Sequence, residues 1–160
     1  MKILLVAPSV ALPLVDDEIQ DIINYGLNVN LLKGNVTAIE LLRQITNNNY
    51  DLLYLATHGN KDGILLSDGL LDSSLLTSLV RGRIGAVYLN TCDSLATAQL
   101  IQNETDAEVV ATIVEVPDAT AYHTGSLFAY WLKQTNDVAS SYERSKPGNN
   151  RTYVYLGKKK

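Results

Sequence analysis

The chain has 160 residues, of which 46% are hydrophobic and 19% are charged, so its composition is that of a folded domain and excludes a disordered chain. The net charge of −4 disfavours a nucleic-acid or anionic-membrane partner, which would attract a basic surface. No apolar stretch approaches the ~20 residues of a membrane span, and we expect one domain over residues 1–157 with a basic tail at 158–160.

The first apolar run, Ile3–Ala7, has the length of a strand and is followed by Pro8. It lacks the basic opening and the small-residue cleavage site of a secretion signal, so we interpret it as a buried strand and expect a cytoplasmic protein. Further apolar runs alternate with helical patterns, which predicts an α/β fold with a mainly parallel sheet. In chain order, the expected elements are strand Lys2–Ala7, helix 15–23, strand Asn28–Leu32, helix 37–45, strand Asp51–Ala56, a hairpin arm at Gly63–Gly69, helix Asp72–Val80, strand Ala86–Asn90, helix Ser94–Asn103, strand Val109–Val114, helix Ala119–Lys133, helix Asp137–Arg144 and strand Tyr153–Leu156.

Polar residues at the predicted helix starts support these boundaries. Asp16, Asp17 and Glu18 form an acidic first turn, which suits the positive N-terminal end of a helix. Thr37 with Glu40 has the spacing of a capping box, and the helix before Val80 begins after a capping aspartate at position 72.

Two predicted strands end in residues that carry chemistry. The strand at 51–56 runs into Thr57-His58-Gly59, and the strand at 86–90 runs into Thr91-Cys92. Functional groups of open α/β sheets gather beyond the carboxyl ends of strands, so these side chains are expected to meet at one edge if the two strands are neighbours. An imidazole near a thiol can take its proton, and the expected helix near residue 94 favours negative charge at the sulfur.

Each side chain alone also has an inert interpretation. An unpaired cysteine is often a small buried hydrophobe, and His58 reads as an ordinary histidine at a strand end. Their joint placement favours catalysis. The other histidine, His123, lies in the expected helix at 119–133 and is interpreted as structural. One cysteine and two histidines give no zinc set, and no nucleotide-binding glycine motif is present, so no metal or cofactor is expected.

Three segments in this order resemble the CHAT branch of the caspase-like (clan CD) cysteine peptidases. They are Tyr-Leu-Ala-Thr-His-Gly at 54–59, Gly-Ile-Leu-Leu-Ser-Asp-Gly at 63–69 and Val-Tyr-Leu-Asn-Thr-Cys-Asp-Ser at 87–94. Residues 109–118 and the closing strand at 153–157 extend the resemblance over nearly the whole chain. It implies a caspase-like three-layer α/β/α sandwich with a His58–Cys92 dyad, and oxyanion donors at Gly59 and at the Cys92 amide.

The resemblance also suggests how substrate is bound. In separase, a relative, an acidic residue after the fifth strand recognises an arginine at P1, and Glu115 falls at the matching place. A carboxylate there can equally be exposed or paired with an internal arginine. Asp93 is a second acidic candidate, and Asp118 is interpreted as a helix cap. This chain departs from the family at Val114, where tryptophan is usual, and at Asp93-Ser94-Leu95, where Glu-Ser-Gly is frequent.

The sequence therefore predicts a cysteine endopeptidase that cleaves a protein or peptide after Arg or Lys. By analogy with the family, it would be an effector switched on by a separate protein or small ligand, for example in antiviral defence. Two alternatives stay open: a non-catalytic ligand-sensing or protein-interaction module with the same fold, and a hydrolase of small esters or amides. The basic positions Arg144, Lys146 and Arg151 are candidate self-cleavage sites or an ordinary solvated loop.

Overall fold

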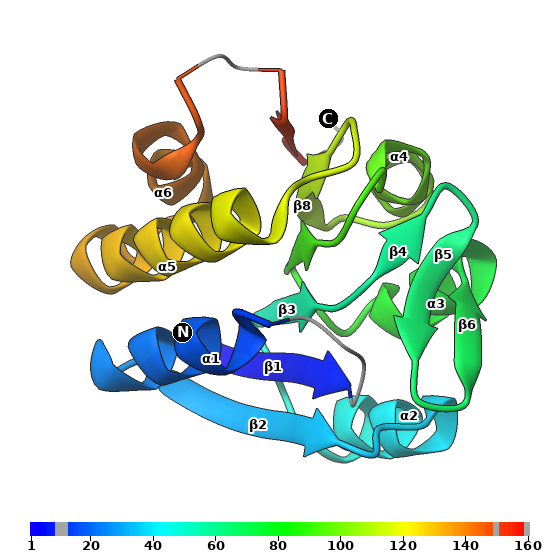
Figure 1. The fold of residues 1–160 in the computed structure, drawn as a ribbon. Helices are drawn as coiled ribbons and strands as arrows, with labels where there is room; N and C mark the ends of the chain where they lie inside the picture. The colour runs from blue at the N-terminus through cyan, green and yellow to red at the C-terminus, as the bar shows by residue number, and fades with distance from the viewer. Residues whose placement is uncertain (9–12, 149–150, 159–160) are drawn as a thin grey trace.

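A six-stranded sheet forms the centre of the molecule (Figure 1). The computed structural model describes residues 1–8, 13–148 and 151–158, so Lys159 and Lys160 of the expected basic tail lie outside the described residues. The first five strands in the sheet order run parallel and the last is antiparallel, which confirms the mainly parallel sheet. The order is β2 (Asn28–Gly34), β1 (Lys2–Pro8), β3 (Leu52–Ala56), β7 (Ala86–Asn90), β8 (Glu108–Thr112) and β9 (Tyr153–Leu156).

Helices cover both faces of this sheet, as Figure 1 shows. One face packs against α2 (Ala38–Asn47), α3 (Ser73–Val80) and α4 (Leu95–Glu104). The other packs against α1 (Val15–Asn24), α5 (Asp118–Thr135) and α6 (Val138–Ser145). The chain therefore forms the predicted three-layer α/β/α sandwich.

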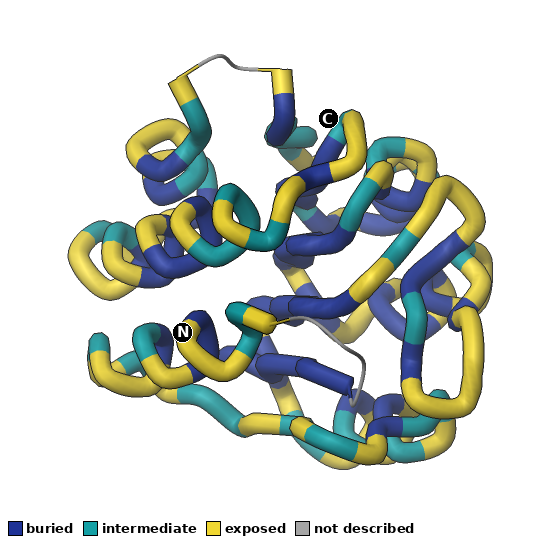
Figure 2. Tube along the Cα trace, viewed as in Figure 1, coloured by how far each residue is buried: buried dark blue, intermediate teal, exposed yellow. Residues whose placement is uncertain are grey.

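The central strands are buried on both faces because their side chains alternate between two apolar cores. In β1, Leu4 and Val6 enter the core beneath α2 and α3, whereas Ile3 and Leu5 enter the core beneath α1 and α5. This explains the uninterrupted apolar runs in the sequence, since both sides of such a strand need apolar side chains. Figure 2 shows the buried strands between helices whose outer surfaces are exposed.

Three helix starts are capped by side chains, and two of these caps, Thr37 and Asp72, are the ones that the sequence predicts. Thr37 Oγ1 accepts a hydrogen bond from the Glu40 amide at 3.2 Å, and Asp72 Oδ1 accepts one from the Ser74 amide at 2.8 Å. Asp137 Oδ2 caps α6 in the same way at 2.8 Å. Each bond satisfies an amide that has no partner within its own helix.

A second, three-stranded antiparallel sheet follows β3. It consists of β4 (Gly59–Asn60), β5 (Gly63–Leu66) and β6 (Gly69–Asp72), in line with the predicted hairpin arm. Glycine is required at position 63, because a Cβ there would collide with the Leu71 carbonyl and lie 3.2 Å from Asp72 Cα.

The strand β8 is shorter than the sequence indicates. The apolar run predicts a strand to Val114, but β8 ends at Thr112. The Val114 carbonyl instead accepts a hydrogen bond from the Asp93 amide at 3.1 Å, so this segment leaves the sheet to contact the turn after β7. Val114 is accordingly exposed, despite its apolar side chain.

Candidate active site

The register of two central strands brings His58 and Cys92 to the same edge of the sheet. Strand β3 pairs in parallel with β7, and Ala56 lies opposite Asn90. His58 and Cys92 each stand two positions beyond these partners. Neighbouring strands are about 4.8 Å apart, so the two segments leave the sheet side by side.

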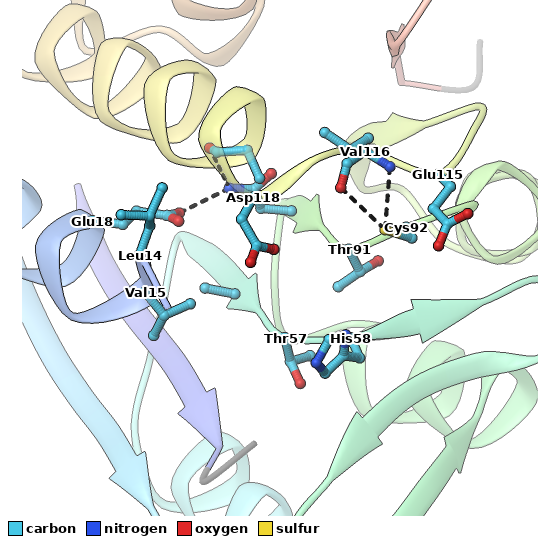
Figure 3. Close-up of a pocket in the computed structure, with 13 residues that line it drawn as sticks. Leu14, Val15, Glu18, Thr57, His58, Thr91, Cys92, Glu115, Val116 and Asp118 are labelled. Carbon is cyan, nitrogen blue, oxygen red and sulfur yellow. Dashed lines mark hydrogen bonds between the residues drawn. The ribbon is translucent and has the colours of Figure 1, made fainter. Parts of the chain in front are cut away.

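Both side chains line one cavity of about 130 Å³ at this edge (Figure 3). Its walls come from the start of α1, the ends of β3 and β7, and the segment leading into α5. The lining residues are Leu14, Val15, Glu18, Ala56, Thr57, His58, Asn90, Thr91, Cys92, Glu115, Val116, Asp118 and Ala121.

The half-buried Cys92 sulfur receives a backbone hydrogen bond. The Val116 amide donates to Sγ at 3.2 Å, and Sγ lies 3.6 Å from the Val116 carbonyl oxygen (Figure 3). An N–H donor is a favourable partner for an anionic sulfur. Helix α4 begins three positions after Cys92, at Leu95, and its N-terminal end also favours negative charge nearby.

A tight turn holds Cys92 in this position. Asp93 adopts a left-handed conformation with φ of 48°, which carries strain for a residue other than glycine. The amides of Asp93 and Ser94 donate to the carbonyls of Val114 and Thr112 at 3.1 and 3.0 Å. These bonds to the end of β8 and to the residue two positions beyond it stabilise the turn.

His58 lies at the exposed mouth of the cavity, on a segment that is fixed to β5. Its carbonyl accepts a hydrogen bond from the Leu65 amide at 2.9 Å. The buried Thr57 hydroxyl donates to the Leu65 carbonyl at 2.7 Å. The hairpin thus sets the backbone position of the histidine.

The remaining predicted site residues take different positions. Glu115 is exposed and lines the cavity, whereas Asp93 is exposed and is not among the lining residues. Gly59 does not line the cavity either, but a Cβ there would lie 3.0 Å from Thr91 Cβ and Oγ1, so the close packing needs glycine. Asp118 lines the cavity as the first residue of α5. The prediction that it caps the helix is wrong, because the N-cap is Pro117.

Sequence reasoning missed a buried carboxyl group in the cavity. Glu18 is 2% exposed, and its Oε2 accepts hydrogen bonds from the Tyr54 hydroxyl and, at 2.8 Å, from Asn90 Nδ2. Asn90 is held in turn by the Tyr153 hydroxyl, which donates to its Oδ1 at 2.5 Å. Burial raises the pKa of Glu18 to about 7, because the charged form is poorly solvated there.

Acidic side chains therefore dominate the charge of this cavity. Its lining includes Glu18, Glu115 and Asp118, and, among the described residues, His58 is the one basic side chain. Among the described residues, in this cavity and outside it, no three His, Cys, Asp or Glu side chains gather as a metal ion would require. None of the described helices is long and apolar enough to span a membrane.

Comparison with known proteins identifies the class of fold. No protein-family model and no curated protein matches the chain. The solved structure of the Arg-specific cysteine proteinase gingipain R superposes with a TM-score of 0.71 at 12% identity, over 98% of this chain and 46% of that one. A complex of the Porphyromonas gingivalis RgpB pro- and mature domains gives a TM-score of 0.67 at 9% identity, over 98% and 47%.

The chain thus has the caspase-like α/β/α fold that gingipain R also has. At these identities the likeness establishes the fold. The chain spans about half the length of the structures it matches.

Proposed function

We propose that this chain is a cysteine endopeptidase in which His58 and Cys92 form the catalytic dyad. The observation that carries the proposal is the strand register, which places both residues at equivalent positions beyond adjacent parallel strands and in one cavity. The backbone hydrogen bond from Val116 to the sulfur and the nearby start of α4 add electrostatic support for a thiolate.

In the proposed reaction, His58 accepts the Cys92 thiol proton and the sulfur attacks the scissile carbonyl carbon. The C–N bond breaks, His58 returns the proton to the departing amine, and an acyl-enzyme thioester forms. Water then attacks the thioester and gives one proton to His58, the C–S bond breaks, and the carboxylic acid product leaves. The same proton finally returns to the sulfur, so no cofactor is needed.

The oxyanion that forms in each step needs backbone donors, and the proposed donors are the amides of Cys92 and Gly59. In support, the next two amides, those of Asp93 and Ser94, already donate to the carbonyls of Val114 and Thr112. Across the described residues, no carbonyl accepts a hydrogen bond from the Cys92 amide.

We also propose a preference for a basic P1 residue. Three carboxyl groups line the cavity, and a cationic side chain is the complement of such a lining. A solved structure with this fold is described as an Arg-specific proteinase.

Membership of the CHAT branch stays a proposal that rests on the motifs around His58 and Cys92. Three further statements also stay proposals: a cytoplasmic location, one domain over residues 1–157, and activation by a separate protein or small ligand. One matched structure is a complex of pro- and mature domains, which supports a protein partner for this fold.

The test is labelling with a peptidyl-arginyl chloromethyl ketone followed by mass mapping. We expect one adduct, on Cys92, and loss of both labelling and peptide cleavage in Cys92→Ala. His58→Ala should slow labelling at least about tenfold, whereas His123→Ala, which alters the other histidine on the exposed side of α5, should label at the normal rate. Equal labelling of the two histidine variants would refute the dyad and favour a non-catalytic module.

A further inference from the structure

The carboxyl group of Glu18 is part of the lining of the cavity beside Cys92. Both hydrogen bonds that Glu18 accepts go to Oε2, from Tyr54 and Asn90. Within the described structure, no donor reaches the second oxygen, Oε1, although the residue is 2% exposed and lines the cavity. A buried carboxyl group with one unused oxygen facing a cavity is a place where a ligand donor can bind.

Part of the cavity lining is apolar. This part consists of Leu14 and Val15 at the start of α1, Ala56 at the end of β3 and Ala121 on α5. The volume of about 130 Å³ is close to that of the ~150 Å³ engineered cavity that binds benzene. A lining that combines apolar side chains with carboxyl groups matches a side chain that has an aliphatic stem and a cationic head.

We propose that Glu18 is the residue that recognises the basic P1 side chain, with Oε1 accepting a hydrogen bond from its guanidinium or ammonium group. This inference rests on the proposed peptidase function and deepens it. Asp118, which points from the first turn of α5 toward the same space in Figure 3, supplies a second negative charge.

The position of Glu115 makes it the weaker candidate for this role. In Figure 3 it lies on the opposite side of Cys92 from Glu18. Glu115 is exposed, so water screens its charge, whereas the buried carboxyl group of Glu18 acts in a medium of low dielectric constant. Discrimination between a charged and a neutral P1 side chain should therefore come mainly from Glu18.

The burial that isolates Glu18 also couples recognition to pH. Because the pKa of Glu18 is raised to about 7, a fraction of the molecules carries a protonated Glu18 at neutral pH. In those molecules, Glu18 must lose its proton before it can form an ion pair with a cation. Apart from His58, the titratable groups around Glu18 on every packed element are carboxyl groups, phenols and one thiol, and none of them carries a positive charge. They are Asp21 on α1, Tyr54 on β3, Tyr88 on β7, Cys92 after β7, Glu115 and Asp118 before and on α5, and Tyr153 on β9.

The experiment compares two coumarylamide substrates, acetyl-Ala-Ala-Arg and acetyl-Ala-Ala-citrulline, which differ at P1 in charge but hardly in shape. Glu18→Gln keeps an oxygen that accepts from Tyr54 and Asn90, so the network is preserved. We expect this variant to lower kcat/KM for the Arg substrate about 10- to 100-fold while changing the citrulline substrate little. Asp17→Asn removes the same charge from the adjacent, exposed position and should keep the wild-type ratio.

The pH dependence of the wild-type protein gives a second readout that needs no variant. The Arg-to-citrulline ratio of kcat/KM should fall by up to about tenfold for each pH unit below 7, as Glu18 becomes protonated. Changes in His58 or Cys92 ionisation affect both substrates alike and cancel in the ratio. An unchanged ratio in Glu18→Gln would overturn the assignment while leaving the peptidase proposal intact.

The peptidase proposal can also fail while the assignment of Glu18 holds. Binding measurements on the Cys92→Ala protein, which cannot cleave a substrate, separate this case. The probes are the corresponding Arg and citrulline peptide amides. Preference for the Arg peptide that disappears in Cys92→Ala/Glu18→Gln supports Glu18 as the recognition residue even if the wild-type protein cleaves neither coumarylamide. Equal binding of the two peptides by Cys92→Ala contradicts it.

Discussion

Gly125 on α5 lies against the buried hydrogen bonds around Glu18, and replacing it with alanine tests that packing. A Cβ at this position would lie 2.5 Å from Glu18 Oε2, 2.8 Å from Asn90 Nδ2 and closer still to the Tyr54 hydroxyl. All three groups are buried and bonded to one another, so they cannot swing into solvent to make room. We therefore expect Gly125→Ala to force this cluster apart.

Two effects of this substitution oppose each other. Alanine inside a helix is more favourable than glycine by about 1 kcal/mol. Overpacking costs about 1–3 kcal/mol, and each buried polar group that loses its partner costs a further 1–3 kcal/mol or so. The net result should be a loss of about 1–4 kcal/mol in the free energy of unfolding, with a fall in Tm of about 3–12 °C.

Urea and thermal unfolding at neutral pH measure this change. The matched control is Gly85→Ala, whose Cβ would lie 4.0 Å from the Asp51 carbonyl and should leave stability equal or slightly higher. Combining Gly125→Ala with Tyr54→Phe removes one of the colliding atoms, so the double variant should lose less than the sum of the two single losses. Gly125→Ala protein as stable as the wild type would refute the packing argument.

Further predictions concern the same buried groups and one helix cap. Tyr54→Phe should lower the free energy of unfolding by about 1–3 kcal/mol, because it removes a hydrogen bond to Glu18. Tyr88→Phe removes a buried hydroxyl that has no partner among the described residues, so it should leave stability equal or higher. Urea titrations measure both changes. Folding raises the pKa of Glu18 from 4.5 to about 7. The contribution of protonated Glu18 to the free energy of unfolding is therefore complete below about pH 4.5 and is lost as the pH rises to 7. Between these limits, the free energy of unfolding of Glu18→Gln should rise by up to about 3 kcal/mol relative to that of the wild type. Asp72→Ala should cost about 1 kcal/mol by the same assay, through loss of the α3 cap; a neutral result would show that the cap does not contribute.

The sequence predicted those parts of the fold that depend on local signals. Strand β7 reads as a continuous apolar run because both of its faces are covered, and its bounds are confirmed. The caps Thr37 and Asp72 were recognisable because their side chains act within one turn. The end of β8 was not, since it depends on a hydrogen bond from Asp93, a residue distant in the sequence.

The same distinction applies to the candidate site. The adjacency of β3 and β7 was inferable, because a helix and a hairpin separate them and both end in polar residues. Glu18 was interpreted only as part of an acidic first turn. Its spacing from Val15 and Ile22 would have placed it on the buried face of the helix, but its partners Tyr54 and Asn90 come from distant strands. The role of Gly125 depends on those partners and has no local signal.

The two helices that enclose the cavity come from opposite ends of the chain, and they are joined directly. Asp21 on α1 accepts hydrogen bonds from Tyr122 and Ser126 on α5, at 2.8 and 3.0 Å. During synthesis, a chain that has emerged only through α4 already carries the imidazole and the thiol, but it has neither the α5 wall nor the Val116 amide beside the sulfur. The wall of the cavity is therefore completed only once α5 has been made, later than the strand ends that carry His58 and Cys92.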